Sequence, residues 1–288
     1  MEKKSVIPEY SVLMSVYGRD RAEWFRAAVQ SMLDQTIPPK EFVLVCDGAL
    51  GPELEAVLDV FLREYPDVIQ TVKLPENRGL GHALQQGLLR CRCEFVARMD
   101  ADDIAVKDRV ERQLTVLAAQ PETSVIGGQI AEFTEKTEQV TGYRVVPVSE
   151  KEIRTTAAFR NPMNHVTVVF RRQDVLDAGG YRDFPGFEDY DLWTRMLCAG
   201  KHLMNLQDVL CFVRINEDTY RRRGGLCYFR SAVAMQEELH RCRLVTRRQY
   251  TRNLVVRCLG TVILPAGLRG WLFRTCMRKR TPHEMGGN

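Results

Sequence analysis

The sequence contains no uninterrupted apolar segment of the roughly 18 residues that a transmembrane helix needs. Its best apolar run, 259–268, is short and contains Pro265. The segment before Pro8 and Glu9 has no hydrophobic stretch of the kind that a secretory signal requires. We therefore expect a protein without a signal peptide or a membrane span, located in the cytosol.

Cysteine pairs of the CxxC type are also missing, although the chain has nine cysteines. The odd number and the lack of histidines at zinc-finger spacing favour reduced thiols in the core over disulfides or zinc sites. Internal repeats and low-complexity segments are absent as well. With 288 residues, 45% hydrophobic and 27% charged, the composition is that of a globular protein and excludes a disordered or collagen-like chain.

Acidic residues are scarce near the C-terminus, where residues 221–280 hold 15 Lys and Arg but only Glu237 and Glu238. The overall formal charge of +4 therefore combines an acidic body with a basic tail. Within 241–280 the basic residues alternate with apolar ones, a composition typical of helices that lie on an anionic bilayer surface. We expect this region to bind such a membrane surface, and no nucleic acid, because no recognition motif accompanies the charge.

Strand and helix patterns alternate along the first half of the chain. Apolar strands are expected at 10–16, 42–46, 68–73 and 94–99, and amphipathic helices at 21–33, 52–64 and 79–91. A further strand is expected at 166–170 and a helix at 188–198. This alternation predicts an α/β protein with a mostly parallel sheet flanked by helices. We divide the chain into a catalytic domain, 1–215, and a basic, amphipathic helical region, 216–288.

Three carboxylates lie close together directly after the strand 94–99, at Asp100, Asp102 and Asp103. Such a group is costly unless it is solvated or neutralised by a cation. In α/β sheets ligands bind at the carboxyl ends of the strands, and Mg²⁺ and Mn²⁺ prefer oxygen ligands. We therefore expect Asp100 and Asp102 to hold Mn²⁺ or Mg²⁺ and to leave positions for diphosphate oxygens. The alternative is a solvated acidic turn.

Polar residues follow two other expected strands. Asp47 ends the strand 42–46, where its side chain either caps the following turn or accepts hydrogen bonds from a nucleobase. Asn77 and Arg78 either form an ordinary entry to a helix or line a nucleotide pocket, with Arg78 near a phosphate.

Two acids, Glu188 and Asp189, open the helix expected at 188–198, after a glycine-rich approach at 179–187. Acids in a first helical turn are favoured by the helix dipole without any functional demand. At the rim of a cleft, however, a carboxylate there could act as the general base that deprotonates a sugar hydroxyl. Asp191 is interpreted as a helix-turn acid and Trp193 as a core residue.

Taken together, these segments resemble glycosyltransferase family 2, the inverting transferases with a GT-A, Rossmann-like fold. The resemblance covers residues 10–215 and is carried by six ordered segments, Ser11–Tyr17, Ser31–Thr36, Val43–Gly48, Asn77–Leu80, Asp100–Asp102 (a DXD motif) and Gly179–Trp193. More narrowly, the segments 97–103, 161–165 and 221–225 resemble bacterial transferases that extend O-antigen or capsule repeat units.

The resemblance implies a role for each matching position. Tyr17 and Asp47 would hold a uracil ring, Asn77 would line the nucleotide pocket, and Asp100 and Asp102 would bind ribose, diphosphate and metal. Asp189 would be the catalytic base, and Glu188 would contact the acceptor or that base. The donor would be a UDP-sugar and the acceptor a lipid-linked saccharide in surface polysaccharide biosynthesis, with the enzyme peripheral at the inner face of the cytoplasmic membrane.

Three further residues are candidates for contacts to the acceptor or the diphosphate. His165 could touch donor or acceptor, although a single histidine near a strand is more often structural. Arg222 and Arg223 lie in a basic run that is either solvated or an arm that closes over the diphosphate.

Two other functions compete with glycosyl transfer. A sugar nucleotidyltransferase shares the α/β core, but it usually carries a glycine-rich phosphate loop after the first strand, and the corresponding loop here has the single glycine Gly18. A noncatalytic, membrane-peripheral binder of nucleotides or saccharides would not need Asp189.

Overall fold

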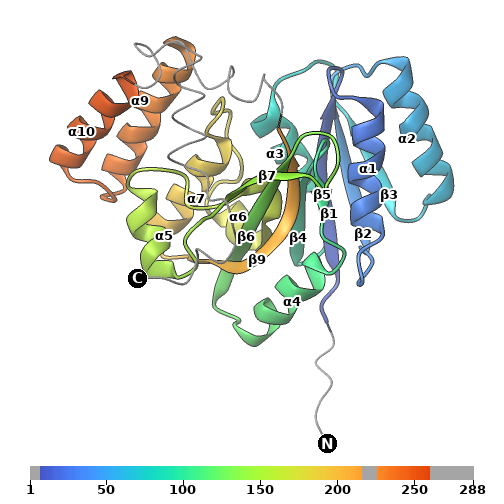
Figure 1. Cartoon of the computed structure of the whole chain (residues 1–288), viewed down its shortest axis with the longest axis horizontal. Helices are drawn as coiled ribbons and strands as arrows, with labels where there is room; N and C mark the ends of the chain where they lie inside the picture. The colour runs from blue at the N-terminus through green and yellow to red at the C-terminus, as the bar shows by residue number, and fades with distance from the viewer. Residues whose placement is uncertain (1–6, 216–225, 260–288) are drawn as a thin grey trace, which may run out of the picture.

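The structure is a computed structural model, and it describes residues 7–215 and 226–259. The described strands form one nine-stranded sheet with helices on both faces (Figure 1). The strands are β1 (Tyr10–Tyr17), β2 (Glu41–Asp47), β3 (Ile69–Lys73), β4 (Phe95–Asp100), β5 (Ile104–Ala105), β6 (Thr123–Phe133), β7 (Val140–Arg144), β8 (Val169–Arg171) and β9 (His202–Arg214). The helices are α1 (Ala22–Leu33), α2 (Pro52–Glu64), α3 (Leu80–Arg90), α4 (Arg109–Ala119), α5 (Glu150–Ala157), α6 (Arg172–Asp177), α7 (Glu188–Cys198), α9 (Leu226–Arg241) and α10 (Arg247–Cys258).

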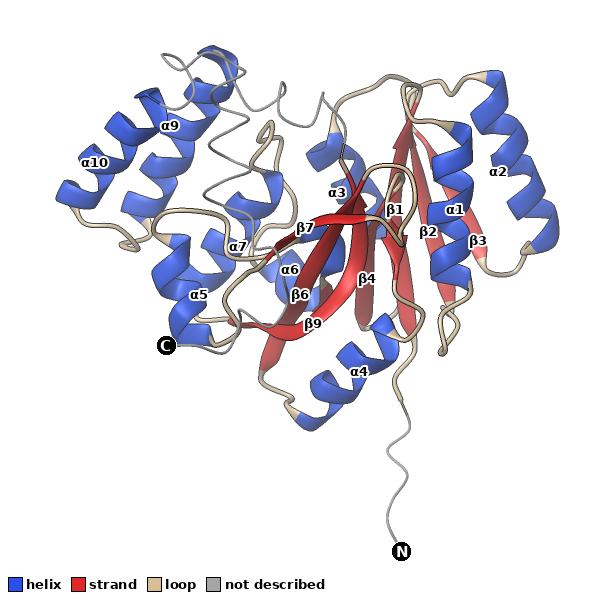
Figure 2. Ribbon diagram, in the orientation of Figure 1, coloured by secondary structure: helices blue, strands red, loops and turns tan. Residues whose placement is uncertain are grey.

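The strand order is β3-β2-β1-β4-β8-β6-β9-β5, with β7 paired to β6 (Figure 2). β1 runs parallel to both β2 and β4, and β2 runs parallel to β3. β8 is antiparallel to β4 and β6, whereas β6 and β9 are parallel. The expected α/β sheet flanked by helices is confirmed, and the helix expected at 188–198 has those bounds in α7.

The strand expected at 166–170 is wrong in its bounds. A 3-10 turn covers His165–Thr167, and β8 begins only at Val169. The carbonyl of Asn164 explains the difference, because it accepts the backbone N–H of Thr167 at 2.9 Å and the Thr167 hydroxyl at 2.7 Å. These bonds hold the apolar segment in a turn, so its hydrophobicity reflects burial and not extended structure.

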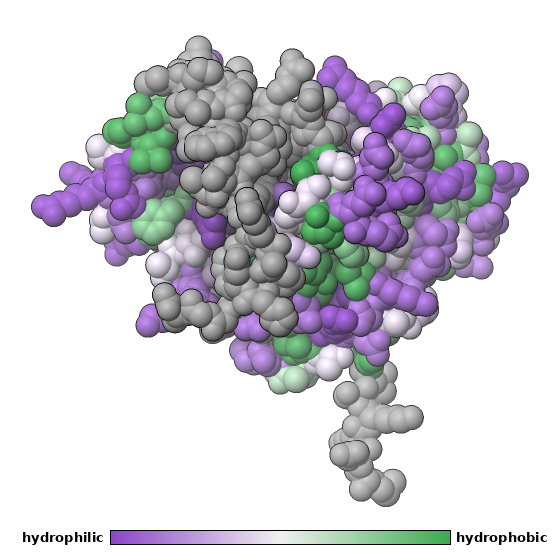
Figure 3. Space-filling view, in the orientation of Figure 1, coloured by the Kyte–Doolittle hydropathy of each residue, from purple (hydrophilic) through white to green (hydrophobic). Residues whose placement is uncertain are grey.

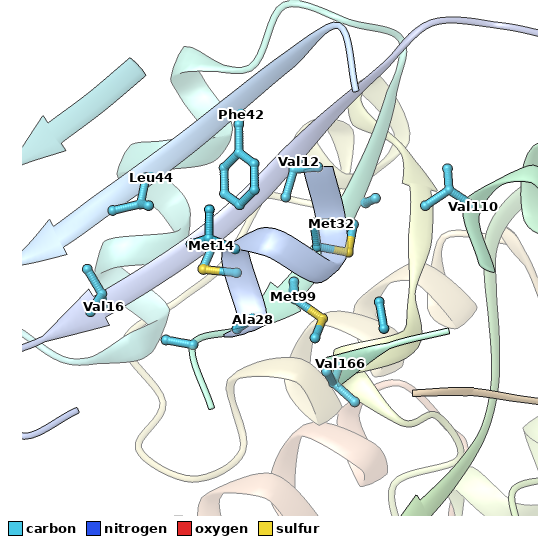
Figure 4. Close-up of a cluster of buried hydrophobic side chains, with 14 of the residues drawn as sticks. Val12, Met14, Val16, Ala28, Met32, Phe42, Leu44, Met99, Val110 and Val166 are labelled. Carbon is cyan, nitrogen blue, oxygen red and sulfur yellow. The ribbon is translucent and has the colours of Figure 1, made fainter. Parts of the chain in front are cut away.

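Two hydrophobic cores lie on opposite faces of the sheet, because side chains alternate along each strand. On one face Val12, Met14 and Val16 of β1 pack with α1, α2 and α4 (Figure 4). On the other face Leu13 of β1 packs with side chains of α3, α6 and α7. Both faces of the parallel half are therefore covered, and functional groups can reach a ligand only at the strand ends.

The helices α9 and α10 lie at the end of the molecule opposite α2 (Figure 1). Met235 and Leu239 of α9 are buried in the same core as Trp193 of α7. Asn253 of α10 is buried and donates to the carbonyl of Ala158 at 2.7 Å. No helix within the described ranges combines the length and the apolar composition needed to cross a membrane.

A buried ion pair shapes the chain just before α7. The Asp191 carboxylate is fully buried. Its Oδ2 atom accepts a hydrogen bond from Arg195 Nε at 2.9 Å and lies 2.8 Å from Arg195 Nη2 in an ion pair. Arg195 also donates to the carbonyls of Ala178 and Gly180, which closes a turn whose two glycines, Gly179 and Gly180, both have positive φ angles. The interpretation of Asp191 as a structural acid therefore fits its contacts.

Asp191→Asn should destabilise the protein by roughly 3 kcal/mol, because it leaves the buried Arg195 guanidinium without a counter-charge. The free energy of unfolding in urea measures this loss. Asp177→Asn is the control, since it removes the same charge from a half-exposed carboxylate that lies 3.9 Å from Lys201, and a surface pair contributes about 1 kcal/mol or less. Equal losses in the two variants would contradict a structural role for the Asp191–Arg195 pair.

Candidate active site

The parallel strands bring three predicted residues to one edge of the sheet. Tyr17 at the end of β1 is in register with Asp47 at the end of β2, and Ser15 of β1 is in register with Asp100 at the end of β4. Neighbouring strands are about 4.8 Å apart. Tyr17, Asp47 and Asp100 therefore lie along the same carboxyl edge, where α/β proteins bind ligands.

A pocket of about 500 Å³ opens at this edge. It is lined by the β1–α1 loop at 17–19, by 47–49 after β2, and by Asn77. Gly48 has a φ of +84°, and a Cβ at this position would lie 2.7 Å from the backbone nitrogen of Asn77. The backbone at Gly48 thus forms one wall of the pocket, and no side chain fits there.

The carboxylate of Asp47 is buried and binds the loop that precedes α3. Its oxygens accept the backbone N–H groups of Arg78 at 2.9 Å and of Gly79 at 3.0 Å. This contact differs from the expected cap of the following turn, because Asp47 caps a segment about 30 residues further along the chain. The position also places a negative charge at the N-terminus of α3, which the helix dipole favours. Asn77 and Arg78 themselves are exposed.

Asp100 is held by an arginine that the sequence patterns did not single out. Arg98 lies two residues earlier on β4 and therefore on the same face of the sheet. Its guanidinium is buried and binds both Asp100 oxygens, one of them at 2.6 Å. The available signal was an arginine at an inward position of an otherwise apolar central strand, two residues before the acid.

The turn after Asp100 concentrates negative charge. Asp103 is buried and accepts the backbone N–H of Arg214 at 2.8 Å, and the Arg214 side chain lies against Trp24 and Phe133. Burial and the negative charges of Asp102 and Asp100 raise the pKa of Asp103 well above its ordinary value.

A hard divalent cation fits this turn chemically, because its donors are carboxylate oxygens and it would neutralise the charge that raises the pKa of Asp103. Within 7–215 and 226–259, however, no three His, Cys, Asp or Glu side chains converge as a ready-made metal site. A cation bound through Asp100 and Asp102 would therefore need further oxygen ligands from a substrate or from water.

The second pair of carboxylates, Glu188 and Asp189, begins α7. Burial raises the pKa of Glu188 to about 6, and it also raises the pKa of Asp189 above its ordinary value. Asp189 accepts a hydrogen bond from the Asn161 amide and one from the Tyr190 backbone at 2.8 Å. A partly buried carboxylate with a raised pKa is a better proton acceptor than a solvated one, which suits a general base.

Helix α3 approaches this second pair closely. A Cβ on Gly81 would lie 2.2 Å from the carbonyl oxygen of Arg182 and 3.0 Å from Cγ of Glu188. The α3 residue Gln85 accepts the backbone N–H of Tyr181 at 2.8 Å. The glycine-rich approach to α7 is therefore packed on α3, and Asp47 binds the loop that precedes α3.

His165 lies against Tyr181, which precedes α7, and against Trp193 of α7. Its Nε2 atom is 2.9 Å from the Tyr181 hydroxyl, and its ring meets the edge of Trp193. Burial, with a contribution from the Arg98 charge, lowers the pKa of His165 well below its ordinary value, so the imidazole is neutral at pH 7. Arg222 and Arg223 lie outside the described residues.

The site thus combines a pocket at the strand ends, an acidic turn and a second carboxylate pair with raised pKa values. The charge of Arg98 acts on carboxylates of both groups, Asp100 and Asp189. Asp100 and Asp189 therefore belong to one electrostatic neighbourhood, although they are 89 positions apart in the sequence.

Sequence comparisons identify relatives of the chain. The profile of "Glycosyl transferase family 2" matches residues 11–180. A glycosyltransferase of Haemophilus influenzae is 37% identical over 94% of this chain and 100% of its own length. The amylovoran biosynthesis glycosyltransferase AmsE of Erwinia amylovora is 37% identical over 83% of this chain and 87% of its own. The UDP-Gal:alpha-D-GlcNAc-diphosphoundecaprenol beta-1,3-galactosyltransferase of Escherichia coli is 31% identical over 94% and 98%.

Solved structures share the fold at low identity. The mannosyltransferase PcManGT of Pyrobaculum calidifontis, in complex with GDP-Man and Mn²⁺, has a TM-score of 0.64 at 17% identity. The matched residues make up 97% of this chain and 78% of the PcManGT chain. Residues 1–349 of TarS from S. aureus, in complex with UDP-GlcNAc, give a TM-score of 0.63 at 15% identity, with coverages of 87% and 72%. The fold is that of the GT-A glycosyltransferases.

The raised pKa of Glu188 makes a prediction about stability. The folded state binds this proton more tightly than the unfolded state, so ionisation of Glu188 opposes folding. Relative to Glu188→Gln, the wild type should lose about 1 kcal/mol of unfolding free energy as the pH rises from 4.5 to 6.5.

Urea unfolding at fixed pH values measures this difference. Glu53→Gln, at an exposed position on α2, is the control for the change in charge. A difference between wild type and Glu188→Gln that stays constant over this pH range would contradict the assignment.

Proposed function

The chain belongs to glycosyltransferase family 2, and on that premise we propose that it transfers a sugar from a nucleoside-diphosphate donor to a lipid-linked saccharide. The reaction inverts the anomeric carbon and belongs to the biosynthesis of a surface polysaccharide such as an O-antigen or a capsule. One observation carries this proposal: the pocket and the acidic turn lie at the same sheet edge, and the charge of the buried Arg98 acts both on Asp100 and on the pair Glu188–Asp189.

The nucleotide binds in the pocket between the ends of β1 and β2. Tyr17 and Asn77 line the pocket and contact the nucleobase. Asp47 fixes the loop before α3, which forms one wall of the pocket, and accepts a hydrogen bond from the nucleobase ring. Arg78 is exposed in the loop that precedes α3, where its side chain contacts a phosphate of the donor. A UDP-sugar is the proposed donor, and the UDP-Gal specificity in the name of the E. coli relative supports this choice.

The diphosphate lies at the acidic turn, where Asp102 and Asp100 would hold Mn²⁺ or Mg²⁺. A divalent cation supplies positive charge that stabilises the departing nucleoside diphosphate. The Mn²⁺ in the PcManGT complex supports a cation at this position. Arg98 binds both oxygens of Asp100 and so fixes the orientation of this proposed ligand.

Asp189 is the proposed catalytic base. It accepts the proton of the acceptor hydroxyl as that oxygen attacks the anomeric carbon, and the electron pair of the breaking C–O bond leaves with the diphosphate. Glu188 contacts the acceptor or the catalytic base, and the neutral His165 contacts the donor or the acceptor. The contacts of Arg222 and Arg223 with the diphosphate remain a prediction from the sequence.

The acceptor is proposed to be lipid-linked because the C-terminal region offers a surface for a bilayer. Of the five large hydrophobic side chains that are strongly exposed in the described chain, four lie on or beside α10: Phe159, Val255, Val256 and Leu259. We call these four the α10 patch. Figure 3 shows hydrophobic surface at the end of the molecule formed by α9 and α10.

The helix that carries most of the α10 patch also carries exposed arginines. Arg247, Arg248 and Arg252 are exposed, and the Arg252 guanidinium lies 4.7 Å from the centre of the Phe159 ring. Exposed apolar groups beside arginines suit an anionic bilayer, where each basic residue contributes about 1 kcal/mol. We propose that the region 216–288 holds the catalytic domain at the cytoplasmic face of the membrane, within reach of a lipid-linked acceptor.

Two carboxylate variants should separate donor binding from transfer. Calorimetry with UDP and, in parallel, with GDP measures nucleotide binding in the presence of Mn²⁺. Asp102→Asn should abolish this Mn²⁺-dependent binding. Asp189→Asn should bind the nucleotide as the wild type does, yet lose sugar transfer by at least about 10²-fold, the smallest contribution expected of a general base. Each variant controls for the other. Near wild-type transfer by Asp189→Asn would refute its role as base, and unchanged binding by Asp102→Asn would refute the metal site.

Val255→Ser with Val256→Ser should weaken sedimentation with phosphatidylglycerol vesicles by about tenfold, because two exposed apolar side chains no longer enter the bilayer. Leu89→Ser is the matched control, since Leu89 is the fifth exposed hydrophobic residue and lies on α3. Equal vesicle binding by the double variant and the wild type would show that the α10 patch does not contact lipid.

A further inference from the structure

Arg98 is buried in the middle of the site, and its contacts are unusual for a core residue. Its side chain is 2% exposed, whereas its partner Asp100 is 32% exposed and stands at the edge of the sheet. The two terminal nitrogens of Arg98 bind the two oxygens of Asp100, as a planar guanidinium fork does with a carboxylate. The rotamer of Asp100 is therefore set by Arg98 and not by solvent.

Stability alone does not account for this arginine. Burying a guanidinium and a carboxylate costs desolvation energy, and apolar residues of similar volume often stabilise a fold as well or better. The Nε atom of Arg98 has no hydrogen-bond partner, so the desolvation is not fully compensated. A charged group retained at this cost points to a role that an apolar residue does not fill.

A second buried arginine, Arg109, provides a comparison. It belongs to α4, and its guanidinium donates to the carbonyls of Arg98 at 2.8 Å and Val168 at 3.2 Å and lies against the sulfur atoms of Met99 and Cys211. These contacts join α4 to backbone and core atoms and include no carboxylate. Arg109 is a structural crosslink on the opposite face of β4, whereas Arg98 is directed at a residue of the site.

The surroundings of Arg98 reach both halves of the site. Its charge acts on Asp100, on Tyr181 and on Asp189. Tyr181 is fixed in turn by the His165 ring and by Gln85 of α3. The charge of one guanidinium thus acts on Asp100 after β4 and on Asp189 in the first turn of α7.

We propose that Arg98 is a positioning residue for glycosyl transfer, which holds the Asp100 carboxylate in the orientation that receives the donor. This inference rests on the proposed function, and it adds a residue outside the acidic motif to the donor site. Arg98 acts through Asp100 and does not itself touch the substrate. Lysine in its place keeps the positive charge but lacks the fork that fixes both oxygens.

Calorimetry on the full chain, with UDP and GDP each in the presence of MnCl₂, tests the proposal. Arg98→Lys should weaken the affinity for the bound nucleotide by at least about tenfold, the usual effect of removing a residue that orients a ligand. Arg109→Lys is the matched control, and it should lower the melting temperature while leaving the nucleotide affinity unchanged. Equal nucleotide affinities for Arg98→Lys and the wild type would overturn the proposal.

A double-mutant cycle separates positioning from a general loss of stability. In an Asp100→Asn background, Arg98→Lys should cause no further loss of affinity, because the group that it orients is already changed. Losses of nucleotide affinity that add up in the double variant would overturn the proposal.

If Arg98→Lys does not fold, Arg98→Met replaces it in the same cycle, since the apolar side chain of methionine is cheaper to bury. A wild type that binds neither nucleotide would refute the proposed function itself, which distinguishes that failure from one confined to Arg98.

Discussion

The parallel pairing of β1 with both β2 and β4 is the constraint on which the site depends. A parallel register places equivalent positions of adjacent strands side by side, so the residues that end these strands meet at one edge whatever their distance in the sequence. Tyr17, Asp47 and Asp100 are neighbours for this reason. The register is held in turn by the two cores, because a slip of one residue would exchange Leu13 with Val12 or Met14 between the faces.

Charge compensation is the second organising feature. Four of the carboxylates in the site or beside it have a defined partner: Asp47 the amides before α3, Asp100 the Arg98 fork, Asp103 the Arg214 amide, and Asp191 the Arg195 guanidinium. Asp189 has the weaker support of an amide side chain and a backbone N–H. The pKa values raised by burial, those of Asp103, Glu188 and Asp189, mark the acids whose charge is least compensated.

The sequence predicted the parts of this arrangement that follow from local patterns. Hydrophobic periodicity located β1, β2, β4 and α7, because each buries a regular face. It failed at His165–Thr167, where the hydrogen bonds of Asn164 turn an apolar segment that reads as a strand. The long strands β6 and β9 were not anticipated.

The sequence also did not predict contacts between segments that lie far apart along the chain. The capping of α3 by Asp47 joins residues 31 and 32 positions apart. The order of the acidic motifs located the candidate site, and the resemblance to the family supplied their roles. Arg98 was missed because periodicity treats an inward arginine as an exception, and only its bonds to Asp100 reveal its purpose.

The backbone at Gly48 limits how the nucleotide preference of the proposed donor pocket can change. Its positive φ, and the distance of only 2.7 Å that would separate an added Cβ from the Asn77 nitrogen, close this wall of the pocket to any side chain. Because Asp47 is also engaged by the loop before α3, the proposed nucleotide pocket can vary its base preference chiefly through the side chains at Tyr17, Arg19 and Asn77. A combinatorial library that seeks a new nucleotide specificity would diversify these three positions and leave residue 48 untouched.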